Sequence, residues 1–526
     1  MSLTCDVIVV GAGHNGLVAA TVLARQGLDV VVLEERGVIG GAARTEYPFA
    51  KAPGVGASTG AYLLGVMQPE LLRLLGANLP LTRRDPHYFL PTLDRRYLLV
   101  GSDDAAMRRQ CVEFFSEDDW RASSALAHEI GQIREDLAPC WLEEPVSVEE
   151  TAERYLRPSV RGAFLDLVRQ PVEAYLDRFG FRSELIAAMY AVTDGFSGLH
   201  ATFGTPGTGL NFLVHNMCRL PGSDGTWMIV TGGMGTVTRE LARLAVEAGA
   251  RIWTDAPVAS ISVRTGRVDG VALRDGREVH ASTVVSNADP FRMRDLVGRD
   301  RFPEAFNAKL DGFRRPGTTL KVNLALDRLP VFSCLPEDRG QHRSTIHLIP
   351  QEPDVFAQLR RGFEQVRAGG LADFPVIEWY THTCVDPSLR DAKGRHNAAM
   401  FVQWAPYALA HGSWDSEENR YVDHLLGIVD RFAPGTRAGV ADVFTLTPAK
   451  IEAHFGMTGG HIHHVDNSFG FDQRMPYVTP VDGLYACGAG CHPAGSVIGS
   501  AGYIAATRVV KDLAVRGAQG VVAPGA

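Results

Sequence analysis

Residues 5–41, CDVIVVGAGHNGLVAATVLARQGLDVVVLEERGVIGG, decide the fold of this chain. Residues 5–10 form a short run rich in β-branched side chains, which is typical of a buried parallel strand. Residues 17–26 have the composition of a helix that stops at Gly27, and residues 29–33 have the pattern of a second strand. The order of strand, glycine turn, helix and strand predicts a right-handed βαβ unit.

The turn after the first strand carries the pattern GxGxxG, formed by Gly11, Gly13 and Gly16. Gly11 permits the tight turn, Gly13 lets backbone N–H groups approach a pyrophosphate, and Gly16 lets the helix pack closely on the strand. Glu34 follows the second strand, where a carboxylate accepts hydrogen bonds from ribose hydroxyls and disfavours a 2′-phosphate. The segment predicts dinucleotide binding, although its spacing alone does not separate FAD from NAD.

Length and composition limit the classes of protein that fit. A chain of 526 residues predicts two or more lobes. The net charge of -8 argues against nucleic acid as a partner, and no basic patch with interleaved aromatic residues is evident. Eight scattered cysteines without a CxxC pair are typical of a reducing compartment, so we expect a cytoplasmic protein. No apolar run reaches the roughly 18 residues of a membrane-spanning helix, which leaves peripheral membrane contact open.

The residues after Glu34 separate the two cofactors. Glu34, Arg36, Gly40 and Gly41 resemble the extended FAD fingerprint of the glutathione-reductase-like flavoproteins, the group of the amine oxidases and phytoene desaturase. Four later blocks resemble phytoene-desaturase-like FAD oxidoreductases in the same order. These blocks are GTPGTGLNFLVHNM, GTWMIVTGGMGTVTRELA, FGMTGGHIHHV and GLYACGAGCHPAGSVIGSAGYIAA. The resemblance implies FAD as the cofactor and redox chemistry at the flavin.

The same resemblance implies which residues bind FAD. Glu34 would hold the adenosine ribose, and the backbone of Val258 would meet the adenine. Gly490 and the backbone at 497–498 would lie near the pyrophosphate and the flavin ring. The full predicted set is Gly11, Gly13, His14, Asn15, Gly16, Glu34, Glu35, Arg36, Gly41, Ala42, Val258, Gly490, Val497 and Ile498.

The resemblance and the changing pattern along the chain together predict an α/β protein with two domains. A discontinuous Rossmann FAD domain of the amine oxidase and phytoene desaturase type would comprise residues 1–90, 226–310 and 455–526. A substrate domain would comprise residues 91–225, which have long charged helical stretches, and 311–454. The latter segment contains strand candidates such as TTLKVNLAL and VIEWYTHT, which predict a largely antiparallel sheet.

Two histidines are candidate catalytic residues. His492 follows the terminal GAG block, so it could polarise the flavin or move a proton, or it could instead fix the turn before Pro493. His464 could face the substrate or be a packed histidine. In a strand, His461 and His463 would share one face, a geometry compatible with a metal ion. No cysteine or carboxylate cluster has zinc-site spacing, so we predict no metal.

The expected reaction is hydride transfer between flavin N5 and a hydrophobic, polyene or lipid-like small molecule, as in a desaturase or dehydrogenase. A flavin-dependent saturase or isomerase and an amine oxidase are the enzyme alternatives. A lipid-binding escort similar to the Rab GDP-dissociation inhibitors is the non-enzyme alternative. Thiol–disulfide exchange is not expected, because no redox cysteine pair follows the nucleotide motif. The oligomeric state stays open.

Overall fold

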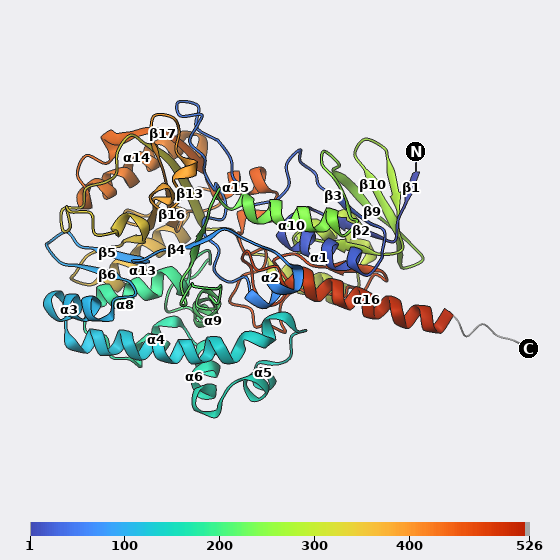
Figure 1. Cartoon of the computed structure of the whole chain (residues 1–526), viewed down its shortest axis with the longest axis horizontal. Coiled ribbons are helices and arrows are strands. Elements are labelled where there is room, and N and C mark those ends of the chain that lie inside the picture. The colour runs from blue at the N-terminus through green and yellow to red at the C-terminus, as the bar shows by residue number, and fades with distance from the viewer. Residues whose placement is uncertain (1, 521–526) are drawn as a thin grey trace, which may run out of the picture.

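A five-stranded parallel sheet forms the centre of one of the two lobes (Figure 1), in a computed structural model that describes residues 2–520. Its order is β18 (Leu484–Ala486), β12 (Val284–Ser286), β2 (Val7–Val10), β3 (Val30–Leu33) and β8 (Arg251–Trp253). All four neighbouring pairs are parallel. Along the chain this is the order 3-2-1-4-5 of dinucleotide-binding sheets, which confirms the predicted βαβ start and the α/β fold class.

Three helices pack against this sheet and one another. They are α1 (His14–Arg25), α10 (Gly235–Glu247) and α16 (Ser500–Gly520). Helix α1 contacts both α10 and α16. The approach of α16 is close, because a Cβ atom at Gly502 would lie 2.1 Å from the carbonyl oxygen of Asn15. Helix α16 is therefore fixed against α1.

A four-stranded sheet shares the hydrophobic core of this lobe. Its order is β1 (Ser2–Thr4), β11 (Glu278–His280), β10 (Arg267–Leu273) and β9 (Val258–Arg264). Short elements nearby are α2 (Pro69–Leu75), α11 (Pro290–Val297), α12 (Glu304–Phe313), and the pair β4 (Leu81–Arg83) and β7 (Met228–Val230).

The second lobe contains a seven-stranded sheet. Its order is β17 (Val440–Leu446), β13 (Thr319–Leu326), β16 (His396–Gln403), β15 (Val376–Tyr380), β14 (Thr345–Leu348), β5 (Tyr88–Pro91) and β6 (Tyr97–Val100). Every pair is antiparallel except β14 with β5, which confirms the predicted antiparallel sheet. The predicted domain boundary at residue 90 falls inside β5. Strands β5 and β6 form a hairpin, and the sequence of a hairpin does not show which of two sheets it joins.

The helices of the second lobe cover this sheet and extend below it (Figure 1). The elements are α3 (Asp104–Phe114), α4 (Glu117–Leu137), α5 (Val148–Tyr155), α6 (Pro158–Arg169), α7 (Val172–Asp177), α8 (Glu184–Tyr190), α9 (Thr208–His215), α13 (Val355–Arg367), α14 (Trp414–Phe432) and α15 (Pro448–Phe455). None of the helices in the described residues is long and apolar enough to cross a bilayer.

Strand β13 shows how the second sheet has one apolar face and one polar face. Leu320, Val322 and Leu324 belong to a hydrophobic core that also contains residues of α14. Lys321 and Asn323 alternate with them and therefore point to the opposite face, although both are buried. A buried lysine on this face needs an environment other than a hydrocarbon core.

Candidate active site

Residues of both lobes line one cavity with a volume of about 680 Å³. The first lobe contributes the glycine turn after β2 and the start of β9. The second lobe contributes side chains of β13, β15 and β16. The size is typical of a cofactor or small-molecule site.

The glycine turn after β2 leaves its backbone accessible to a ligand. Gly13 is the N-cap of α1 and provides no side-chain cap, so the first N–H groups of the helix are available to an anion. A Cβ atom at Gly13 would lie 2.7 Å from Nδ2 of Asn287. A Cβ atom at Gly16 would lie 2.2 Å from the carbonyl oxygen of Gly11, so helix and turn pack closely only with glycine there.

Glu34 presents a carboxylate that the backbone holds in place. Its Oε2 accepts a hydrogen bond from the N–H of Ala12 at 2.8 Å, and its Oε1 accepts one from the N–H of Arg36 at 3.1 Å. Burial raises the pKa of Glu34, and these two hydrogen bonds oppose that shift. The residues present therefore fit FAD. The glycine turn would contact the pyrophosphate, and the carboxylate of Glu34 would accept hydrogen bonds from the ribose.

Most of the predicted cofactor residues come together in the cavity. Those that line it are Gly11, Gly13, His14, Asn15, Glu34, Glu35, Gly41, Ala42, Val258 and Val497. The other four do not line it. Gly16 packs on Gly11, Arg36 donates from Nη2 to the carbonyl of Ala453, Gly490 packs against Val465 and Pro290, and Ile498 belongs to the core of the second lobe.

His492 does not line the cavity. Its Nε2 lies 2.9 Å from the carbonyl oxygen of Cys140, which only accepts, so this nitrogen carries the proton and donates. Its ring meets the ring of Phe471 edge to face, with 5.2 Å between centroids. Burial lowers the pKa of His492 to about 4. This position does not support the catalytic interpretation and favours a structural role for the histidine.

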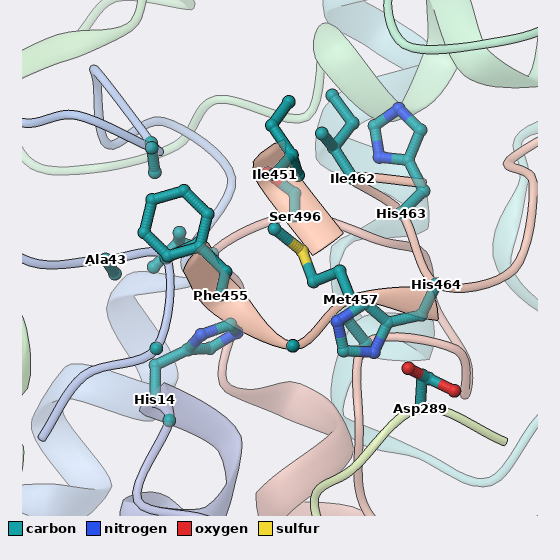
Figure 2. Close-up of a pocket in the computed structure, with 18 of the residues that line it drawn as sticks. His14, Ala43, Asp289, Ile451, Phe455, Met457, Ile462, His463, His464 and Ser496 are labelled. Carbon is teal, nitrogen blue, oxygen red and sulfur yellow. The ribbon is translucent and has the colours of Figure 1, made fainter. Parts of the chain in front are cut away.

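His464 lines the cavity, close to Met457 and Asp289 (Figure 2). Its backbone has φ 61°, and its Nδ1 has no hydrogen-bond partner among the described residues. His14 lines the same cavity with an equally unpartnered Nε2. Burial lowers the pKa of both rings, that of His14 to about 4, so both are neutral hydrogen-bonding groups near pH 7. The catalytic role of His464 stays a prediction.

The histidine-rich segment is not a strand. A short 3-10 turn at Thr458–Gly460 precedes it, and residues 462–464 form turns and bends, so His461 and His463 do not share a strand face. Instead, Nδ1 of His463 lies 2.8 Å from the carbonyl oxygen of Gly495, and Nε2 lies 3.0 Å from the carbonyl oxygen of Ser197. Within residues 2–520, no three metal-ligating side chains lie close enough together to hold a metal ion.

The terminal cysteines lie in apolar surroundings. Cys487 and Cys491 are both free and buried, and burial raises the pKa of Cys491 to about 12. A thiol with a raised pKa is a poor nucleophile. The segment that contains them does not support thiol–disulfide chemistry.

The cavity also contains a polar cluster that sequence reasoning missed. It consists of Arg84, Asp194, Lys321, Glu378 and Tyr380. Lys321 of β13, Phe401 of β16 and Glu378 of β15 are cross-strand neighbours in one row. The available signal was a charged residue inside each of two strand candidates with few other charges, Lys321 in TTLKVNLAL and Glu378 in VIEWYTHT.

Burial shifts the protonation equilibria of this cluster. It raises the pKa of Glu378 to about 7 and that of Asp194 to about 8, and it lowers the pKa of Lys321 to about 7. The hydroxyl of Tyr380 donates a short hydrogen bond to Glu378. Groups that titrate near neutrality in a cavity are typical of a functional site.

Comparison with known proteins is consistent with this geometry. A profile of the family described as Flavin containing amine oxidoreductase matches residues 16–360. The chain is 34% identical to mouse pyridine nucleotide-disulfide oxidoreductase domain-containing protein 2, over 97% of this chain and 94% of that protein. It is 28% identical to hydroxyneurosporene desaturase of Cereibacter sphaeroides, over 70% of this chain and 82% of that protein.

A solved structure of putrescine oxidase has the same fold, with a TM-score of 0.60, 15% identity, and coverage of 98% of this chain and 100% of that one. The resemblance to phytoene-desaturase-like FAD oxidoreductases is confirmed by these relatives. The chain therefore belongs to the flavin containing amine oxidoreductase family and is an FAD-dependent oxidoreductase.

Proposed function

We propose that this oxidoreductase removes a hydride from a C–H bond of a largely hydrophobic substrate, as a dehydrogenase or desaturase does. One observation carries the proposal: apolar side chains of the second lobe line the same cavity as the dinucleotide turn. Ile451, Phe455, Met457 and Ile462 lie along it in Figure 2. The bound FAD supplies the two-electron acceptor.

The residues of the chain bind and orient the substrate and exclude water from it. Phe401 and Met457 are each 7% exposed and Leu63 is 9% exposed, so the apolar wall is largely removed from solvent. Apolar contacts of this kind would hold a hydrocarbon segment in the cavity. The hydroxyneurosporene in the name of the desaturase relative is one candidate for a substrate with such a segment.

Amine oxidation is the second candidate, and both the family description and the putrescine oxidase likeness favour it. The side chains in the cavity favour it less. Arg84 carries a fixed positive charge in the same cavity, and Lys321 is charged when protonated. Both charges raise the free energy of bringing a protonated amine beside them. We therefore rank C–H oxidation of a hydrophobic substrate above amine oxidation.

Anaerobic mixing of the purified holoenzyme with a panel of substrates tests the proposal. The panel contains polyenes, saturated lipids, and amines with alkyl chains of matched length. We expect polyenes or lipids to bleach the flavin absorbance and amines to leave it unchanged. Bleaching by the amines alone would contradict the proposal.

The same experiment distinguishes a dehydrogenase from a saturase, an isomerase and a lipid-binding escort. A saturase would reoxidise chemically reduced enzyme when the unsaturated compound is added, and an isomerase would form product without net change in the flavin spectrum. An escort of the Rab GDP-dissociation-inhibitor type would contain no flavin and would bind none on addition of FAD.

A further inference from the structure

Arg84 is a buried cation without a carboxylate partner. Its side chain lines the cavity and the residue is 2% exposed. Nε donates to the carbonyl oxygen of Trp227 at 3.0 Å, and Nη1 donates to Oγ1 of Thr345 at 2.7 Å. Both acceptors are neutral, and Nη2 makes no hydrogen bond to any described residue. A guanidinium stays charged at every physiological pH, so this site carries a fixed positive charge.

Lys321 is a second cation in the same cavity. Its Nζ lies 3.7 Å from the ring centroid of Tyr62 and 4.3 Å from that of Phe401, which places the ammonium against two aromatic faces. Phe401 also stands between Lys321 and Glu378 in the cross-strand row. Among the described residues, no carboxylate oxygen lies within ion-pair distance of Lys321, although the charge of Glu378 acts to raise the pKa of the lysine.

The two nearby carboxyl groups do not neutralise these cations. Glu378 accepts a hydrogen bond from Tyr380, and Oδ2 of Asp194 accepts one from Nδ2 of Asn216 at 3.1 Å. Burial raises the pKa of Asp194 to about 8, so most of it is the neutral acid near pH 7. Burial raises the pKa of Glu378 to about 7 and lowers that of Lys321 to about 7, so these two groups are part-charged to a similar extent, whereas Arg84 keeps its full charge. The polar part of the cavity is left with an excess of positive charge, which is costly in a buried site.

We propose that Arg84 binds an oxyanion at the end of an apolar substrate, a carboxylate or a phosphate monoester, and that Lys321 adds positive charge to the same cavity. This inference rests on the proposed use of the cavity as the substrate site, and it names the substrate class. Nη2 of the guanidinium provides a hydrogen-bond donor for such an anion, and the ammonium of Lys321 attracts the anion through its charge. The apolar wall accommodates the rest of the molecule. The substrate is then an amphipathic acid rather than a plain hydrocarbon or an amine.

Hydrocarbons and amines fit the polar cluster less well. A hydrocarbon provides no acceptor for Nη2 of Arg84 and leaves both cations without a counter-ion. An alkylamine adds a third positive charge. An oxyanion instead lowers the free energy of both cations, and its charge favours the protonated form of Lys321, whose pKa burial lowers to about 7.

Isothermal titration of the holoenzyme near pH 7 with four eight-carbon probes tests the proposal. The probes are octanoate, octyl phosphate, octanol and octylamine. We expect at least one of the two anions to bind tenfold or more tightly than octanol and octylamine, and the comparison between the anions identifies the preferred head group. Equal or tighter binding of octanol or octylamine would overturn the proposal.

Two cavity variants and one control locate the effect. Arg84→Gln and Lys321→Met should each weaken binding of the preferred anion about tenfold and leave octanol binding within about twofold. Arg83→Gln is the matched control, because Arg83 pairs with Asp224 and does not line the cavity. Unchanged anion binding in both cavity variants, each with full flavin content, would overturn the assignment.

The titration stays informative when a variant fails. If Arg84→Gln does not retain FAD, the ranking of the four probes on the unmodified enzyme and the Lys321→Met variant decide the question. Binding does not require turnover, so anion selectivity without flavin reduction would support this site and contradict the proposed reaction. Flavin reduction by a neutral polyene without anion selectivity would support the proposed reaction and contradict the anion site.

Discussion

Asp194 is a buried carboxyl in the wall of the cavity, and its surroundings favour the neutral acid. The residue is 3% exposed, and its Oδ1 has no hydrogen-bond partner among the described residues. Its pKa is raised from 3.8 to about 8, mainly by burial and to a smaller extent by the charge of Glu378, whereas the hydrogen bond from Asn216 opposes the shift. Between about pH 4 and pH 8 the folded protein therefore holds a proton that the unfolded chain releases.

The sign of the resulting pH dependence follows from this proton balance. Because the folded state binds more protons, Asp194 lowers the stability of the protein as pH rises through this range, by up to about 1.4 kcal/mol per pH unit. Asp194→Asn removes the titration and keeps an acceptor for Asn216. We expect the stability of the variant relative to wild type to increase from pH 5 to pH 8, measured by urea unfolding. Exposed Asp177→Asn is the control, and parallel curves for Asp194→Asn and wild type would contradict the prediction.

At the scale of elements, the segment between β18 and α16 connects the two lobes. His492 donates to the carbonyl of Cys140 in the second lobe, and the carbonyl of His492 accepts from the hydroxyl of Tyr477 at 2.7 Å. Arg474 donates to the carbonyls of Cys491 and Ala489 in the same segment. These hydrogen bonds fix the backbone that continues to Val497 at the cavity.

His492→Asn should therefore act on stability rather than on chemistry. Asparagine is too short to keep the bond to Cys140, and losing a buried hydrogen bond costs about 1–3 kcal/mol. We expect a lower thermal midpoint, a rate constant of flavin reduction within about twofold of wild type, and an unchanged pH profile. His128→Asn on the exposed side of α4 should change none of these. A large loss of rate at unchanged stability would restore His492 as a catalytic residue.

At the scale of the whole molecule, distant chain segments form the FAD site. Gly13 and Glu34 belong to one stretch of sequence and Val258 and Val497 to two others, and all four line one cavity. The same cavity is walled by the sheet of the second lobe. A ligand bound there contacts both lobes, so its binding free energy adds to the stability of the folded chain.

Removal of FAD should accordingly lower the unfolding midpoint of the protein. At a free FAD concentration of a hundred times Kd, the stabilisation is about 2.7 kcal/mol. We expect thermal unfolding of the apoprotein to shift upward on addition of FAD and not on addition of NAD, which lacks the flavin. A midpoint that does not depend on FAD would contradict a flavin site shared by the two lobes.

The sequence by itself determined the dinucleotide-binding half of this protein. Strand, glycine turn and helix are set by local sterics, because Gly11 adopts φ 97° and Gly16 leaves no room for a side chain. Glu34 follows at a fixed distance along the chain, so its place at the end of β3 was also predictable. The antiparallel sheet of the second lobe followed from the strand patterns alone.

Only the tertiary structure decided what the rest of the cavity contains. Arg84, Lys321 and Glu378 are far apart in the sequence, and no local rule brings β15, β13 and the segment after β4 to one wall. The position of His492 outside the cavity also depends on long-range packing, because its hydrogen-bond partner Cys140 lies in the other lobe. Backbone sterics act over a few residues, whereas the position of a side chain in a shared cavity depends on long-range packing of both lobes.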